Sequence, residues 1–112
     1  MPEVVMIVTT VESRKQAEAL AEALVARRLA ACVQVEAVDS WFRWEGRVER
    51  AAEFRLQAKT TADRAEAAQA LIAELHAYDL PEILVTPVLG GATAYLAWLA
   101  RSVEEPPADT CD

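Results

Sequence analysis

Two long stretches of sequence, joined by a short turn signal, constrain the fold of this chain more than any other feature. Residues 31–44 and 47–59 contain no glycine or proline, and the polar pair Glu45-Gly46 between them is typical of a tight turn. Strands average ~5–6 residues, so each stretch would form a strand of about twice the usual length. The sequence therefore predicts a long β-hairpin whose arm projects beyond its own sheet.

The end of this predicted arm is rich in aromatic side chains. Trp41, Phe42 and Trp44 come directly before the turn. Aromatic residues favour pleated, half-buried surfaces, whereas the tip of a hairpin is normally exposed to solvent. A projecting arm also has open strand edges, which readily pair with another chain. We therefore expect a partner chain to cover the arm.

Size and charge narrow the class of protein. The chain has 112 residues, which fits one domain, and its net charge is −7 at pH 7. Binding to nucleic acids or to anionic membranes needs clustered Lys and Arg, so we predict neither partner. The first residues lack the charged and apolar regions of a signal peptide, and the apolar runs fall far below the ~20 residues of a membrane span. We therefore expect a cytoplasmic protein.

The remaining pattern predicts two more strands and a first helix. Residues 4–8 are apolar on both faces, which indicates a buried central strand. Pro87 cannot donate a backbone hydrogen bond, so a strand over residues 83–89 is expected at the edge of the sheet. Ser13 and Gln16 form a capping-box pattern ahead of an amphipathic helix.

Two further helices complete the predicted order. The second helix is expected to be capped by Thr60, Thr61 or Asp63, and the third follows the fourth strand. The order βαββαβ with a C-terminal helix is the ferredoxin-like arrangement of the α+β class, an antiparallel sheet with two helices on one face. We expect one such domain over residues 1–103, followed by a disordered acidic tail over residues 104–112.

His76 and Cys32 are the residues best suited to bind a metal. His76 is the only histidine, and imidazole is a good ligand for Cu²⁺. It also falls at the end of the second predicted helix, where a histidine usually contacts the helix dipole or a carbonyl group. Cys32 lies on the second predicted strand, where a cysteine most often acts as a small hydrophobic residue, so it is the weaker candidate.

Other polar residues give weaker indications of chemistry. Lys59 is one of two lysines against nine arginines, which favours either a need for a compact positive charge or a plain strand end. Glu45, Glu49 and Glu53 are expected to form a solvated or intersubunit charge pattern. The sequence has no evident nucleophile–base pair and no Cys-x-x-Cys or His-Glu-x-x-His spacing. We therefore predict that the protein is not an enzyme.

Five sequence blocks together resemble the CutA divalent-cation-tolerance family. They follow the order of the family and are specific as a set. The blocks are RLAACV at residues 28–33, SWFRWEG at 40–46, EFRLQAKT at 53–60, LHAYDLPEI at 75–83 and YLAWL at 95–99.

This resemblance implies a ferredoxin-like subunit, a tight homotrimer similar to the PII signalling proteins, and a link to tolerance of copper and other divalent metals. It implies no catalytic activity. The copper site proposed for the family uses a cysteine at the end of the first strand and two adjacent histidines, and the matching positions here are Thr9, Leu75 and His76. The expected metal is therefore Cu²⁺, with His76 as its best single ligand and Cys32 as the next.

The leading hypothesis is a non-enzymatic homotrimer linked to divalent-metal tolerance, which binds a metal or a small ligand in a cleft between subunits. The residues expected to line that cleft are Trp44, Lys59, His76, Tyr78 and Glu82. Two alternatives stay open: a PII-like signalling scaffold, and a small enzyme that uses Lys59 and Glu82 as polar groups. An RNA-binding sheet is disfavoured because residues 4–8 carry no aromatic side chain and the chain is acidic.

Overall fold

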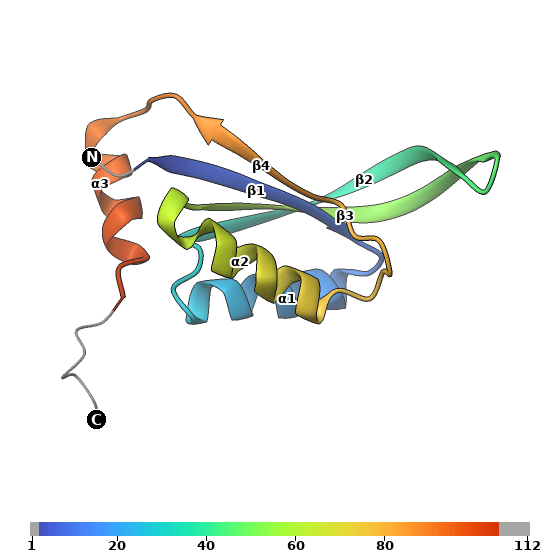
Figure 1. Ribbon diagram of the computed structural model, residues 1–112, viewed down its shortest axis with the longest axis horizontal. Coiled ribbons are helices and arrows are strands. Elements are labelled where there is room, and N and C mark those ends of the chain that lie inside the picture. The colour runs from blue at the N-terminus through green and yellow to red at the C-terminus, as the bar shows by residue number, and fades with distance from the viewer. Residues whose placement is uncertain (1–2, 106–112) are drawn as a thin grey trace.

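The chain forms a four-stranded antiparallel sheet in the order β2-β3-β1-β4 (Figure 1). The computed structural model describes residues 3–105. The elements in chain order are β1 (Val4–Val11), α1 (Arg14–Ala26), β2 (Cys32–Trp44), β3 (Arg47–Thr61), α2 (Ala62–Leu75), β4 (Ile83–Val88) and α3 (Thr93–Ser102). The predicted ferredoxin-like βαββαβ arrangement with a C-terminal helix is confirmed.

β1 is the central strand that its apolar pattern predicted. It pairs with β3 on one side and with β4 on the other, and Ile7 is fully buried. The strand runs on to Val11, past the predicted end at residue 8, because the β-branched Thr9 and Thr10 continue the pairing with β3. β4 has β1 as its single neighbour, so Pro87 lies on an edge strand as predicted.

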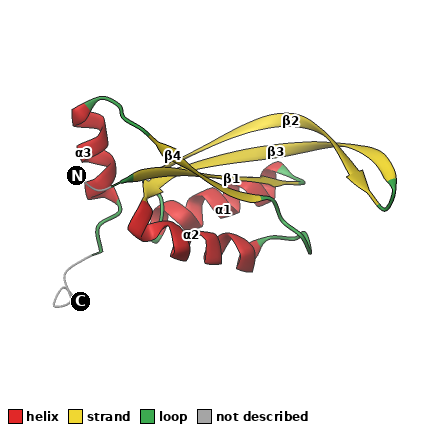
Figure 2. Cartoon of the chain, turned by 45° about the horizontal axis from the view of Figure 1, so that its top comes forward, coloured by secondary structure: helices red, strands yellow, loops and turns green. Residues whose placement is uncertain are grey.

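Helices α1 and α2 cover one face of the sheet (Figure 2). The core lies between them and the alternate residues of β1 and β3 that face them. Its largest fully buried aliphatic side chains from these elements are Ile7, Leu24, Leu56 and Ile72. Fully burying such a side chain contributes about 1.5–3 kcal/mol, so this one-sided core supplies much of the stability of the subunit.

The predicted capping box of α1 is only half formed. Ser13 is the N-cap, and its side-chain oxygen accepts a hydrogen bond from the backbone N–H of Gln16 at 3.1 Å. The reciprocal bond is missing, because the buried Oε1 of Gln16 has no hydrogen-bond partner. The start of α2 falls at Thr61, one of the predicted caps, but the Thr61 hydroxyl donates to the Asp63 carboxylate instead of capping the backbone.

The predicted long hairpin is present, and its outer half leaves the sheet. The pairing of β1 with β3 ends at Val11 and Phe54, whereas β2 and β3 remain paired for seven further rungs. We call this segment, residues 38–53, the arm, and its first rung, Val38 with Glu53, the arm root. Seven rungs correspond to roughly 20 Å, and Figure 1 shows the arm projecting away from the helices.

The tip of the arm is a tight two-residue turn, as the sequence predicted. Glu45 and Gly46 both have positive φ values, 50° and 79°, which are typical of a type I′ hairpin turn. The aromatic side chains beside the turn are not covered within the subunit. Trp41 is 65% exposed and Trp44 is 50% exposed, which is unusual for the largest apolar side chains of a chain.

α3 closes the end of the sheet that is opposite the arm (Figure 1). The side chain of Leu99 in this helix is buried, and so is that of Val103, the residue that follows the end of the helix. The next two residues contact arginines of the body: Arg28 donates to the Glu104 carbonyl at 3.4 Å, and Arg64 lies 3.5 Å from the Glu105 carboxylate. The predicted disordered tail therefore begins with two residues in contact with the domain, and residues 106–112 lie outside the described part.

Candidate functional site

The five residues predicted to line a cleft lie in three separate places within one subunit. Trp44 is at the tip of the arm, and Lys59 lies next to α3. His76, Tyr78 and Glu82 belong to the connection from α2 to β4, which lies near the arm root. One subunit alone does not bring these residues together, so a cleft formed by several subunits stays a prediction.

His76 is held by hydrogen bonds at both ring nitrogens. It is the C-cap residue of α2, and its Nε2 lies 2.8 Å from the backbone carbonyl oxygen of Thr10. Its Nδ1 accepts a hydrogen bond from the backbone N–H of Tyr78 at 3.1 Å. Because a carbonyl can only accept and a backbone N–H can only donate, these contacts assign the neutral ring with its proton on Nε2.

The side chain of Tyr78 continues this chain of bonds to the arm root. Its hydroxyl donates to the Glu53 carboxylate at 2.8 Å. Burial raises the pKa of Tyr78 well above its ordinary value, and the hydrogen bond to Glu53 and the negative charges of Glu53 and Glu12 raise it further. The hydroxyl therefore stays protonated near neutral pH and acts as a donor to the carboxylate.

Glu53 was predicted to be part of a solvated or intersubunit charge pattern, and the structure contradicts the solvated alternative for this residue. It is only 8% exposed, although its position along β3 puts it on the face of Arg55 and Gln57, which is turned away from the helices. It is contacted there by Tyr78, which is far away in sequence and donates a hydrogen bond to its carboxylate. The alternation pattern of one strand contains no signal for such a contact. The intersubunit alternative for Glu53 stays a prediction.

Glu82 adds a weaker link to the same cluster. Its carboxylate lies 3.5 Å from the side-chain hydroxyl of Thr10, at the long limit of a hydrogen bond. Thr10 therefore makes two contacts with the connection from α2 to β4. Its backbone carbonyl contacts His76, and its hydroxyl contacts Glu82. We call Thr10, Glu53, His76, Tyr78 and Glu82 the arm-root cluster.

Lys59 and Cys32 form a second group at the other end of the sheet. They are cross-strand partners on β3 and β2, and Cys32 is a free, partly exposed thiol. The Lys59 ammonium lies 3.5 Å from the Tyr95 hydroxyl and 5.7 Å from the centre of its ring. Tyr95 in turn packs on Trp98, with ring centres 5.5 Å apart. The compact positive charge of Lys59 thus lies against an exposed aromatic pair on α3.

The residues at the family's copper positions do not fit a copper site in this chain. Thr9 is 1% exposed and faces the helices, and a hydroxyl is a poor ligand for a soft metal. Leu75 has no donor atom, and both ring nitrogens of His76 already have partners. Within residues 3–105, no group of three or more His, Cys, Asp or Glu residues could hold a metal ion. The neighbours of His76 therefore give no support to the expected copper site, and whether Cu²⁺ binds at His76 or at Cys32 is left to measurement.

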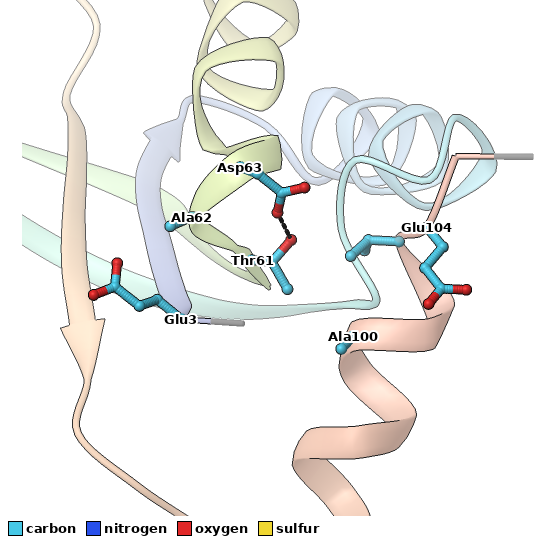
Figure 3. Close-up of a pocket in the computed structure, with 7 residues that line it drawn as sticks. Glu3, Thr61, Ala62, Asp63, Ala100 and Glu104 are labelled. Carbon is cyan, nitrogen blue, oxygen red and sulfur yellow. Dashed lines mark hydrogen bonds between the residues drawn. The ribbon is translucent and has the colours of Figure 1, made fainter. Parts of the chain in front are cut away.

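A pocket of about 290 Å³ lies at the start of α2, away from all of the predicted site residues (Figure 3). Carboxylates from three segments line it, those of Glu3, Asp63 and Glu104. Asp63 is engaged by the Thr61 hydroxyl at 2.6 Å, and its position in the first turn suits the positive end of the helix dipole. Asp63 is therefore explained by its role at the start of α2, and we assign no ligand to this pocket.

The fold and the arm-root cluster define a small α+β protein with an exposed hairpin arm. Comparisons with known proteins identify its family. Within residues 3–105, no helix is long and apolar enough to cross a membrane. The family described as the CutA1 divalent ion tolerance protein matches residues 5–102. The chain belongs to this family, which confirms the resemblance seen in the five sequence blocks.

Relatives match over nearly the whole chain. The divalent-cation tolerance protein CutA of Thermus thermophilus is 42% identical over 103 residues, which cover 91% of this chain and 98% of that protein. The solved structure of CutA from Synechococcus elongatus has a TM-score of 0.89 at 35% identity and covers 93% of both chains. The periplasmic divalent cation tolerance protein CutA of Archaeoglobus fulgidus has a TM-score of 0.88 at 33% identity, over 90% of this chain and 99% of that chain.

Proposed function

We propose that this protein is a non-enzymatic homotrimer that contributes to divalent-cation tolerance, with the arm of each subunit packed on a neighbour. The observation that carries the proposal is the arm itself. Seven rungs of two-stranded ribbon extend beyond β1, and they end in Trp41, Phe42 and Trp44, all of which are exposed in one subunit. An isolated two-stranded ribbon is marginally stable in water, so the arm needs a surface to pack on.

The open face of the sheet offers a surface of matching chemistry. Val8 of β1 and Leu84 of β4 are cross-strand partners, and they lie on the face opposite the core residue Ile7. Leu84 is 56% exposed, so this face keeps apolar surface in contact with solvent in one subunit. A second copy of the chain would cover both the arm and this face, and the resemblance to the CutA family favours three copies over two.

A binding role is favoured over catalysis at the arm-root cluster. The Tyr78 hydroxyl has a raised pKa and is committed to Glu53, which makes it a poor acid or base near neutral pH. The ring nitrogens of His76 are committed to the backbone in the same way. The proposed ligand site is a cleft between subunits, where Trp44 of one arm meets Lys59 or Glu82 of a neighbour.

The metal that this function concerns is a divalent cation, as the family description states. Copper is the expected ion from the resemblance, and its direct binding is a separate question that a titration decides. We place the protein in the cytoplasm as part of this proposal, although the structurally similar Archaeoglobus fulgidus protein is described as periplasmic. Fractionation of the source cells, with an antibody to this chain, tests the location.

Replacement of Trp44 by alanine tests the packing of the arm. If a neighbouring subunit buries Trp44, the substitution lowers the free energy of unfolding by about 3–5 kcal/mol per subunit, the usual cost of deleting a buried aromatic side chain. The matched control is Val25→Ala on α1, because Val25 is similarly exposed, at 44%, but lies on a helix. A loss below about 1 kcal/mol for Trp44→Ala, equal to the control, would show that the arm is uncovered.

A further inference from the structure

The chain differs from its family at the positions where copper ligands are proposed, and the structure indicates what His76 does instead. Thr9 is buried beneath the helices, and Leu75 is 47% exposed but has no donor atom. His76 therefore has no neighbouring ligand from these positions. A lone imidazole gives a weak copper site even when both of its nitrogens are free.

The contacts of His76 join three parts of the fold in one chain of hydrogen bonds. Nε2 bonds the last turn of α2 to the Thr10 carbonyl near the end of β1, at 2.8 Å. Nδ1 fixes the backbone of Tyr78 at 3.1 Å, and the Tyr78 hydroxyl then reaches the Glu53 carboxylate at 2.8 Å. The His76 and Tyr78 rings also pack together, with centres 5.0 Å apart.

We propose that His76 is a structural clasp in this chain, which fixes the connection from α2 to β4 on β1 and sets Tyr78 against Glu53 at the arm root, and that it is not a copper ligand. The two roles exclude each other. A metal at Nδ1 would displace the Tyr78 N–H, and a metal at Nε2 would displace the Thr10 carbonyl.

If the contacts of His76 were broken, the Glu53 carboxylate would lose the hydrogen bond from Tyr78. That carboxylate is 8% exposed, and no cation lies within salt-bridge distance of it in residues 3–105. Its one side-chain donor in this part of the chain is the Tyr78 hydroxyl. A buried carboxylate that loses its donor is strongly disfavoured, so displacement of Tyr78 opposes a metal that binds at Nδ1 of His76. The proposal concerns contacts within one subunit and does not depend on the trimer.

Calorimetric titration with Cu²⁺ alone tests the first half of the proposal. We expect wild type and His76→Gln to bind Cu²⁺ equally well or equally poorly. The positive control is Leu75→His, which adds an exposed imidazole with free nitrogens and should bind Cu²⁺ more tightly than wild type. A loss of about tenfold or more in affinity for His76→Gln would overturn the proposal, because losses of that size follow the removal of groups that support a metal site.

Thermal unfolding without metal tests the second half. His76→Ala removes both hydrogen bonds and should lower the melting temperature by at least roughly 4 °C, since two partly buried hydrogen bonds are lost together. His76→Gln retains an amide that can donate to the Thr10 carbonyl, so its melting temperature should lie between those of His76→Ala and wild type. An unchanged melting temperature for His76→Ala would overturn the clasp.

Nitrogen NMR of the imidazole gives an independent test. The clasp requires the proton on Nε2, and a proton on Nδ1 would contradict it.

Discussion

At the residue scale, the hydrogen bond from Tyr78 to Glu53 gives a buried carboxylate its side-chain donor within residues 3–105. Glu53 is buried and Tyr78 is partly buried, and a buried carboxylate without a hydrogen-bond donor is unfavourable. The bond also ties a loop to the first rung of the arm. Its loss would therefore weaken the point where the arm leaves the sheet.

The substitution Tyr78→Phe isolates this bond. The ring remains but the donor to Glu53 is gone, so we expect the free energy of unfolding to fall by about 1–3 kcal/mol. Urea unfolding measures the change. The matched control is Tyr95→Phe, whose half-exposed hydroxyl lies 3.5 Å from Lys59 and should contribute less than about 0.5 kcal/mol. Equal losses for the two variants would mean that the Glu53 carboxylate finds another partner.

The raised pKa of Tyr78 predicts a loss of stability in alkali. The ordinary value is 10.0, and the folded protein holds the proton to higher pH. Between the two pKa values the folded state binds more protons than the unfolded state, so stability falls as pH rises. The contribution is complete below about pH 10 and is lost progressively above it. Urea unfolding at several pH values should show this decline in wild type and a smaller one in Tyr78→Phe. The same decline in both would contradict the assignment to Tyr78.

At the element scale, the strands and turns were predictable because their signals are local. The Glu45-Gly46 turn needs positive φ at both positions, and Pro87 marks an edge strand wherever it lies. The arm-root cluster was not predictable in the same way. His76 was expected either to contact the helix dipole or a carbonyl group or to bind a metal. The choice of Thr10 and the burial of Glu53 depend on how β1, β3 and the α2–β4 connection meet in space.

Removal of the C-terminal residues tests how much the chain depends on its last element. A chain that ends after Glu105 should keep the stability and the oligomeric state of wild type, because residues 106–112 are predicted to form a disordered tail. A chain that ends after Val103 also loses the contacts to Arg28 and Arg64. Both contacts are long, and the Glu105 side chain is exposed although that of Arg64 is mostly buried, so the further loss should stay below about 1 kcal/mol. A marked drop in stability for the chain that ends after Glu105 would show that residues 106–112 pack on the protein.

At the scale of the whole molecule, one subunit is too extended for its length. Its radius of gyration is 15.3 Å, and its dimensions are 52 × 34 × 20 Å. A compact domain of this size has a radius of gyration of about 13 Å. The arm accounts for the difference, because the sheet and its helices form a body of ordinary proportions beside it (Figure 1). An extended subunit with exposed tryptophans is the form expected of one part of a larger assembly.

The mass of the wild-type protein in solution tests this central claim most directly. Sedimentation or light scattering at micromolar concentration should give three times the subunit mass of 12.3 kDa, with no subunit-sized species. The predicted trimer follows from an arm that needs a neighbour and from the resemblance that sets the number at three. A single species with the mass of one subunit would contradict the account, because Trp41 and Trp44 would then remain in water.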